Sequence, residues 1–190
     1  MYTKLLEVTL ENLKRRYTCN QYFGLGFIQI KLEKEYRIHF YTSLLPAIID
    51  KEDIHNHRYD FTSYILYGEL HQEVFSLHDG YTHNLEEESC QEGYMPKKES
   101  GKLCRIEKLS EQYLIQGSYY TLDHKTFHRV TSTSAITFLK RGDHRKNLAE
   151  VVRPINGFKI CPFSKKVSEE ELWGVVADIL SEAKKDISSQ

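Results

Sequence analysis

The sequence predicts an all-β protein, either a β-sandwich or a small barrel, with helices only at its two ends. Two observations carry this prediction. The chain is rich in aromatic residues, with 13 Tyr and 9 Phe among 190 residues, and such residues favour strands. Most of the interior divides into short strand-like stretches separated by Gly, Asp, Asn and charged turns. Because this length suffices for one hydrophobic core and hardly for two, we expect a single domain over 1–190.

Helices are expected at both ends of the chain. Over residues 3–16, apolar and charged residues recur with a period close to 3.6, which predicts an amphipathic N-terminal helix within 1–17. Near the other end, Ser168 is followed three residues later by Glu171, which is the capping-box pattern, and apolar residues then recur at helical spacing. This pattern predicts a C-terminal helix over 168–187 and leaves 20–160 for the β-barrel core.

Seven stretches between the helices have the composition of strands. Gly68 is expected to turn the chain, so that the stretches on either side of it pair as neighbouring antiparallel strands. Residues 78–111 are polar and irregular, and we expect hairpins with long loops there rather than a second domain. The seven stretches are 22–32, 36–42, 60–68, 70–77, 113–122, 128–132 and 135–142.

The charge and cysteine content restrict the function classes. The net charge of −1 provides no overall field that would attract nucleic acid, so a nucleic-acid partner is not expected. No run approaches the roughly 18 apolar residues of a membrane span. The four cysteines form no Cys-x-x-Cys pair, and the N-terminal stretch lacks a secretory apolar core, so we expect free thiols and a cytoplasmic location.

Three histidines form the candidate site. In a strand, alternate residues point to the same side, so His55 and His57 can present two imidazole nitrogens to one cation. A third histidine, His128, begins a new strand after the polar turn at 123–125, and this strand could return beside the first pair. Neutral imidazole is a common ligand of first-row divalent metals. The sequence therefore predicts a metal site at His55, His57 and His128.

Two motifs around these histidines resemble those of the cupin superfamily. "HNHRYDFTSYILYGEL" is similar to the first cupin motif, with His55, His57 and Gly68 at its spacing. "GSYYTLDHKTFHRV" is similar to the second, with Gly117 at its start, Asp123 and Lys125 in place of a Pro and a Gly, and His128 at the ligand position. The resemblance implies a cupin-type double-stranded β-helix, that is, a jelly-roll barrel, here with short N-terminal and C-terminal helices.

The departure from the cupin pattern concerns one ligand. Where many cupins carry a Glu ligand, this chain has Phe61 or Thr62, and neither suits that role. The set of three histidines that remains resembles the cysteine dioxygenase-like branch of cupins, to which "LYGELHQEVF" and "DHKTFHRV" are also similar. This resemblance implies a divalent metal, with Fe(II) first, and Ni, Zn, Mn or Cu as alternatives.

Arg141 and Tyr120 are the candidate catalytic residues. Thiol dioxygenases that act on cysteine carry a Ser-x-His-x-Tyr set on the strand after the third ligand, whereas this chain has Thr137, Leu139 and Arg141 there. Cysteine is therefore not the expected substrate. If the strand alternates, Arg141 faces the barrel mouth and could hold a carboxylate or phosphate. Tyr120 could donate a hydrogen bond to substrate or oxygen.

Several other residues near these motifs have weaker claims on the site. Arg37 and His39 share a strand face that lines either the cavity or the solvent. Tyr64 could act as Tyr120 does, and His124 belongs either to the turn or beside the third ligand. Asp60 and Glu73 are candidates to brace metal-bound imidazoles.

Three functions are compatible with these observations. The first is a mononuclear non-haem iron enzyme, dioxygenase-like, that acts on a small polar or anionic substrate. The second is an isomerase or lyase similar to the sugar epimerase cupins, and the third is a non-catalytic protein that binds a small ligand in a cupin pocket. A small molecule is the expected partner in each case, and a homodimer is left open.

Overall fold

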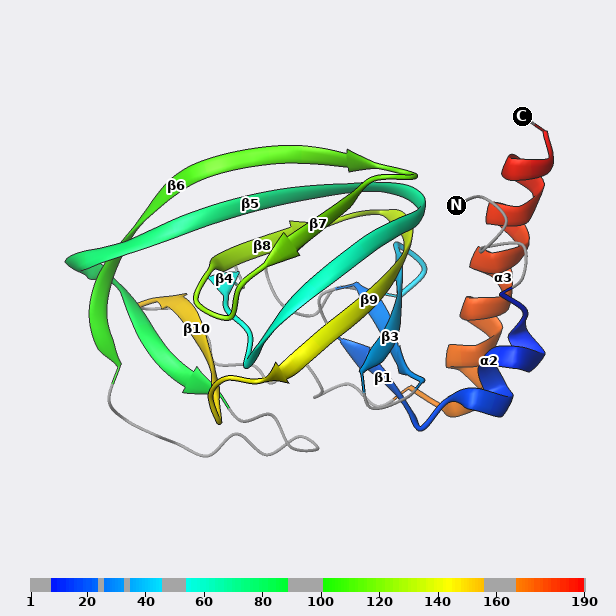
Figure 1. Cartoon of the computed structure of the whole chain (residues 1–190), viewed down its shortest axis with the longest axis horizontal. Helices are drawn as coiled ribbons and strands as arrows, with labels where there is room; N and C mark the ends of the chain where they lie inside the picture. Colours follow the sequence, from blue (N-terminus) through cyan, green and yellow to red (C-terminus); the bar gives the residue numbers. More distant parts are fainter. Residues whose placement is uncertain are drawn as a thin grey trace.

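Two antiparallel sheets and two helices make up the fold in the computed structural model, which describes residues 8–23, 26–32, 35–45, 54–88, 101–155 and 167–189. The strands wrap around a common interior, and the helices lie together at one end of the molecule (Figure 1). The helices are α2 (Leu10–Arg16) and α3 (Glu169–Ser188). The strands are β1 (Cys19–Phe23), β2 (Phe27–Lys31), β3 (Tyr36–Thr42), β4 (Ile54–His55), β5 (Tyr59–Glu88), β6 (Lys102–Ile115), β7 (Tyr119–Leu122), β8 (Phe127–Thr131), β9 (Ser134–His144) and β10 (Ala149–Pro154).

The long strand β5 belongs to both sheets. Its first part pairs with β9 on one edge and with β7 on the other, and β9 continues the first sheet through β3 and β2 to β1. Its later part pairs with β6 on one edge, and with β8 and then β10 on the other, while β4 lies between β8 and β10. All of these pairings are antiparallel. The predicted all-β jelly-roll fold is confirmed.

Gly68 does not reverse the chain, so the prediction of a turn there was wrong. Strand β5 continues through this residue, and the strands predicted on either side of it do not pair with each other. Gly68 has φ of +73°, and a Cβ atom there would lie 2.2 Å from the carbonyl oxygen of Ser134. A glycine can bend the chain in this way while it approaches another backbone closely. The bend carries β5 from the first sheet into the second.

The region 78–111 also differs from its prediction. Its described parts belong to β5, up to Glu88, and to β6, from Lys102, and they form one long antiparallel ribbon with an irregular register between Asp79 and His83. Most side chains of β6 are exposed. The ribbon therefore lacks the alternating hydrophobic pattern by which a half-buried strand is recognised in a sequence. Residues 89–100 lie outside the described part of the chain.

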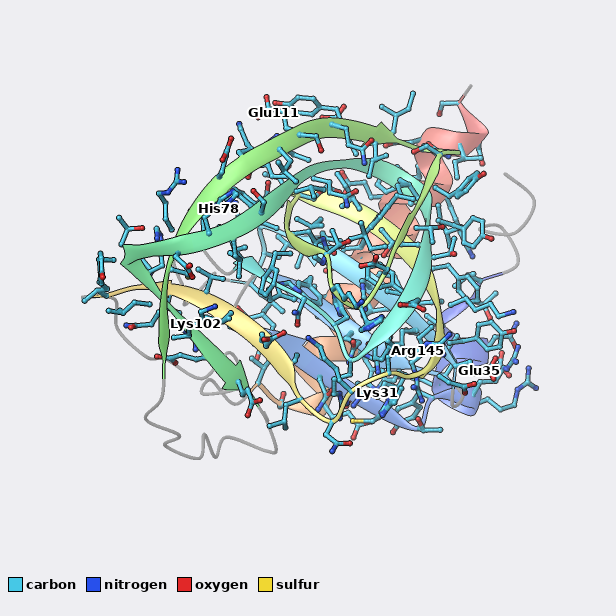
Figure 2. All side chains as sticks on the ribbon, turned by 60° about the vertical axis from the view of Figure 1, so that its left-hand side comes forward. Lys31, Glu35, His78, Lys102, Glu111 and Arg145 are labelled. Atoms are coloured by element: carbon cyan, nitrogen blue, oxygen red, sulfur yellow. The ribbon has the colours of Figure 1, made fainter. Side chains whose placement is uncertain are left out.

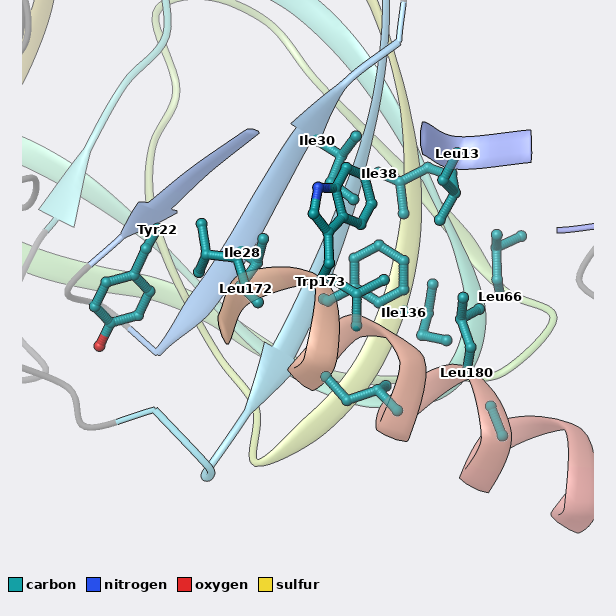
Figure 3. Close-up of a cluster of buried hydrophobic side chains, with 14 of the residues drawn as sticks. Leu13, Tyr22, Ile28, Ile30, Ile38, Leu66, Ile136, Leu172, Trp173 and Leu180 are labelled. Carbon is teal, nitrogen blue, oxygen red and sulfur yellow. The ribbon is translucent and has the colours of Figure 1, made fainter. Parts of the chain in front are cut away.

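Both helices cover the outer face of the first sheet. Ile28 of β2 and Ile38 of β3 are buried against α3, where they share a cluster with Leu172 and Trp173 (Figure 3). In turn, the odd-numbered residues of these strands point to the inside of the barrel. The inside of the barrel holds a second core, formed by Tyr41, Tyr59, Phe61, Ile65, Leu70, Leu114, Tyr120, Leu122, Ala135 and Leu139.

The helix bounds follow local capping. Ser168 caps α3, because its Oγ accepts a hydrogen bond from the backbone N–H of Glu171 at 3.1 Å. Thr9 caps α2 in the same way, with Asn12 as the donor at 3.1 Å. Residues 1–7 of the predicted N-terminal helix lie outside the described residues. Within the described ranges, neither helix combines the length and the apolar character needed to cross a bilayer.

Candidate metal centre

Two short strands bring the three predicted histidines together. His55 lies on β4 and is paired in register with His128 on β8, while His57 lies two residues after the end of β4. The Nε2 atoms of His57 and His128 are 2.8 Å apart, and the potential ligand atoms of all three residues lie within 4.8 Å of one another. The three imidazole rings have centroid separations of 4.9 to 5.0 Å. The structure therefore places all three side chains around one point.

Asn56 holds the two neighbouring histidines in place. Its side chain is almost fully buried, at 1% exposure. Its Nδ2 donates to Glu150 Oε2 at 2.6 Å, and its Oδ1 accepts from the backbone N–H of Glu150 at 2.8 Å. The backbone N–H of Asn56 also donates to the carbonyl oxygen of Glu150 at 3.0 Å. Sequence reasoning missed this residue, because its partner is 94 positions away and no local pattern links the two.

The environment of the histidines favours metal ligation. Burial, and then the charges of His55 and His128, hold the pKa of His57 well below its usual range. Burial, and then His55, do the same for the pKa of His128. Both imidazoles are therefore neutral at pH 7 and have a lone pair to offer. The 2.8 Å between the two Nε2 atoms is a hydrogen-bond distance. Two nitrogens bound to one ion at about 2.1 Å and at a right angle would lie about 3.0 Å apart, so the rings would have to move little to share a divalent ion.

Phe61 and Thr62, the two residues predicted to stand in place of a Glu ligand, have different surroundings. The Phe61 ring is buried and lies 4.6 Å from that of His57 and 6.0 Å from that of His128, measured between centroids. Thr62 bonds to Thr121 through their hydroxyl oxygens, 3.1 Å apart. No carboxylate belongs to this cluster within the described ranges, so its donors are three imidazoles.

A second group of potential ligands lies on the β5–β6 ribbon, with His71, Glu73 and Glu111 within 4.8 Å of one another. Its carboxylates already have cationic partners. Arg129 Nε donates to Glu73 Oε2 at 2.7 Å, and Lys108 pairs with both Glu73 and Glu111. Glu111 lies on the outer side of β6 (Figure 2). Because a metal would have to displace these cations, the three-histidine cluster is the better site.

Each of the two candidate catalytic residues lies next to an aromatic ring that in turn neighbours His57. Tyr120 packs with its ring centroid 5.8 Å from that of Phe61, and burial raises its pKa to about 12, so its phenol stays protonated. The Arg141 guanidinium lies over the ring of Tyr59 at 5.3 Å. The Tyr59 ring in turn is 5.8 Å from the ring of His57. The catalytic roles of both residues stay predictions.

Other predicted neighbours of the site have partners elsewhere. Asp60 accepts hydrogen bonds from the backbone N–H and the Nδ1 of His124, both at 2.8 Å. Glu73 pairs with Arg129 at 2.5 Å. The Nδ1 of His128 is buried without a hydrogen-bond partner in the part of the chain described. Tyr64 packs against the helix-covered core on the outer face of the sheet.

The inner face of the first sheet carries polar side chains. From the sequence, Arg37 and His39 were considered for this face, and Gln29 was not named. Arg37 and His39 of β3 both contact Gln29 of β2: Arg37 Nη1 donates to Gln29 Oε1 at 3.0 Å, and His39 Nε2 is 3.3 Å from the same oxygen. Burial, and then the charge of Arg37, lower the pKa of His39 to about 3. Sequence analysis missed Gln29. Its only signal was the period of two along the strand, because it alternates with the apolar residues that face the helices.

Comparisons with known proteins leave the family of the chain open. No protein-family model and no curated protein sequence matches it. Among solved structures, the fold is similar to hydroxypropylphosphonic acid epoxidase from S. wedmorenis, with 12% identity, a TM-score of 0.37, and 62% of this chain aligned to 51% of that one. It is also similar to Drosophila melanogaster CENP-C bound to CAL1, with 10% identity, a TM-score of 0.38, and coverage of 74% and 94%. The chain spans about half the length of the epoxidase chain.

Proposed function

We propose that this protein is a mononuclear metal-dependent enzyme, similar to non-haem iron dioxygenases, that acts on a small polar or anionic substrate. One observation carries the proposal: His55, His57 and His128 converge, and among the described residues no carboxylate belongs to their cluster, where the Phe61 ring packs against His57. An Fe(II) ion held on one face by three histidines would keep up to three positions open for a substrate and for O2.

The surrounding side chains supply the other functions that such a site needs. The buried Phe61 ring packs edge-to-face against the His57 imidazole and would help to keep water from the site. The neutral imidazoles of His57 and His128 do not have to lose a proton before they bind a cation. Arg141, which lies over the Tyr59 ring, would attract an anionic group of the substrate towards the histidines.

Oxygen consumption tests the enzymatic part of the proposal. Iron-loaded protein is expected to consume O2 when it is supplied with the right small thiol or carboxylic acid, and the His57→Ala variant is expected to lose this activity. A fully iron-loaded sample that consumes no O2 with any candidate would instead favour an isomerase or lyase. Product analysis of the same reactions, by mass spectrometry, would separate oxygenation from rearrangement.

A non-catalytic ligand-binding protein is the second candidate. Thr137 and Leu139 are buried on the strand where cysteine-acting thiol dioxygenases carry polar auxiliary residues. The absence of the Ser-x-His-x-Tyr set of those enzymes favours a protein that binds a ligand without converting it. A protein that binds a small ligand with and without metal, and converts none, would support this candidate.

A further inference from the structure

Two arginines converge on one aromatic ring inside the barrel. The guanidinium carbon of Arg37, from β3, lies 5.2 Å from the ring centroid of Tyr59, and that of Arg141, from β9, lies 5.3 Å from it. The Tyr59 side chain is buried at 5% exposure, and its ring is 5.8 Å from the ring of His57. Tyr59 therefore neighbours both guanidinium groups and one histidine of the cluster.

Among the described residues, Arg37 interacts with an uncharged amide, with a phenol and with other cations. Its guanidinium donates to the amide oxygen of Gln29 at 3.0 Å, an uncharged acceptor. Burial holds the pKa of Arg37 below its usual range. The phenol of Tyr59 raises this pKa, and the cations of Arg141 and Arg58 lower it, each by less than burial does. The pKa of Lys31, at the end of β2, is likewise lowered by burial first, and also by Arg37, Arg58 and Arg141. Cations gathered in this way repel one another, so an anion between them would be bound favourably.

A buried hydroxyl on the same face is independent evidence for a ligand. Thr137 of β9 is paired in register with His39 and lies two residues before Leu139, which is paired with Arg37. Its side chain is 1% exposed, and its Oγ1 has no hydrogen-bond partner among the described residues. A buried hydroxyl without a partner costs free energy, and a bound molecule that accepts its proton would remove that cost.

We propose that Arg37 and Arg141 form a binding site for an oxyanion group of the substrate, beside the three histidines, and that the Thr137 hydroxyl donates a further hydrogen bond to the same molecule. Guanidinium groups suit this task because they hold carboxylate and phosphate oxygens through paired hydrogen bonds. Since Lys31 and Arg58 add to the positive field, a doubly charged group is favoured over a single carboxylate. This inference rests on the proposed function, to which it adds the substrate class.

Calorimetric titration of the full chain tests the site with three probes at constant ionic strength: inorganic phosphate, malonate and acetate. Constant ionic strength is needed because salt screens exposed charges. We expect one phosphate or malonate to bind per chain, more tightly than acetate, in metal-free protein as well as in protein loaded with metal. The ratio between phosphate and malonate then identifies a phosphoryl or a dicarboxylate substrate.

Variants distinguish this site from general attraction to cations. Arg37→Gln is expected to weaken binding by roughly tenfold or more, because a charge-assisted hydrogen bond is lost. Arg105→Gln, an exposed position on β6, is the matched control and should leave the affinity unchanged. Thr137→Val should weaken binding several-fold and yet raise the melting temperature of the anion-free protein, because it removes an unsatisfied hydroxyl. A merely structural threonine would not show this opposite pair of effects.

The inference is overturned if neither dianion binds saturably, or if Arg37→Gln and Arg105→Gln bind it as the wild type does. Should Arg37→Gln fail to fold, Arg141→Gln and Thr137→Val decide the matter by the same comparison. Metal content is measured on the same samples. Protein that holds metal but binds no dianion refutes this inference alone, whereas protein that binds the dianion but no metal refutes only the metal-dependent function.

Discussion

The Nε2 atoms of His57 and His128 lie 2.8 Å apart although 71 residues separate them in the sequence. The pairing of β4 with β8 produces this approach, since it places His55 directly opposite His128. Asn56 fixes the neighbouring segment by its hydrogen bonds with Glu150 of β10. The geometry of the cluster is therefore set by contacts among three strands that are distant in the chain.

Asn56→Ala is expected to weaken metal binding by roughly ten- to a hundredfold, the range found when residues that orient metal ligands are lost. The His55–Asn56–His57 segment would no longer be held against β10. Affinity is measured by competition with a chromophoric chelator. Lys146→Gln is the matched control, because Lys146 Nζ also contacts Glu150 Oε2, at 2.6 Å, but does not touch the histidine segment. Equal affinities for the two variants would contradict the orienting role of Asn56.

Phe61→Glu is expected to make the stability of the protein depend on metal. A carboxylate at this buried position would cost about 3 kcal/mol or more in the metal-free protein, whereas a metal ion beside it would pair with the charge. Phe61→Leu is the control, because it keeps the site apolar. Melting temperatures with and without zinc or iron provide the measurement. A loss of stability in Phe61→Glu that metal does not reduce would argue against a metal at this point.

The stability of the metal-free protein is expected to fall in acid through His39. Burial and Arg37 lower the pKa of His39 to about 3, whereas a histidine in the unfolded chain titrates near 6.5. Between these values the unfolded state binds a proton that the folded state does not, so stability is complete above pH 6.5 and declines as the pH falls. His39→Gln should remove about 1.4 kcal/mol per pH unit from this decline. Urea unfolding at several values between pH 7 and 4 measures it, and identical slopes would contradict the expectation.

Gly68→Ala is expected to destabilise the fold by about 2 kcal/mol or more, because positive φ and a close backbone contact both oppose a side chain. A Cβ atom would meet the Ser134 carbonyl oxygen at 2.2 Å. Gly117→Ala separates the two causes: Gly117 also has positive φ, at +92°, but a Cβ atom would meet nothing within 4 Å. The smaller loss is expected for Gly117→Ala in chemical unfolding. Equal losses would mean that the contact with Ser134 contributes nothing.

Local patterns in the sequence predict part of this structure well. Capping residues and apolar spacing indicate α3, and the spacing of His55, His57 and His128 indicates a shared site, because a strand presents alternate residues on one side. The course of the chain at Gly68 could not be predicted in this way, since a glycine between two strand-like stretches is compatible with either a turn or a bend. Contacts such as Asn56 with Glu150, or Arg37 with Gln29, depend on how distant strands pair, and no local pattern contains that information.

Metal content of the purified protein tests the central claim most directly. After expression in medium replete with iron, nickel and zinc, we predict about one divalent metal ion per chain by elemental analysis. His57→Ala should lose this metal, and His78→Ala, exposed on the β5–β6 ribbon, should keep it. Wild-type protein that contains no metal, and whose melting temperature is the same with and without a chelator, would contradict the three-histidine centre.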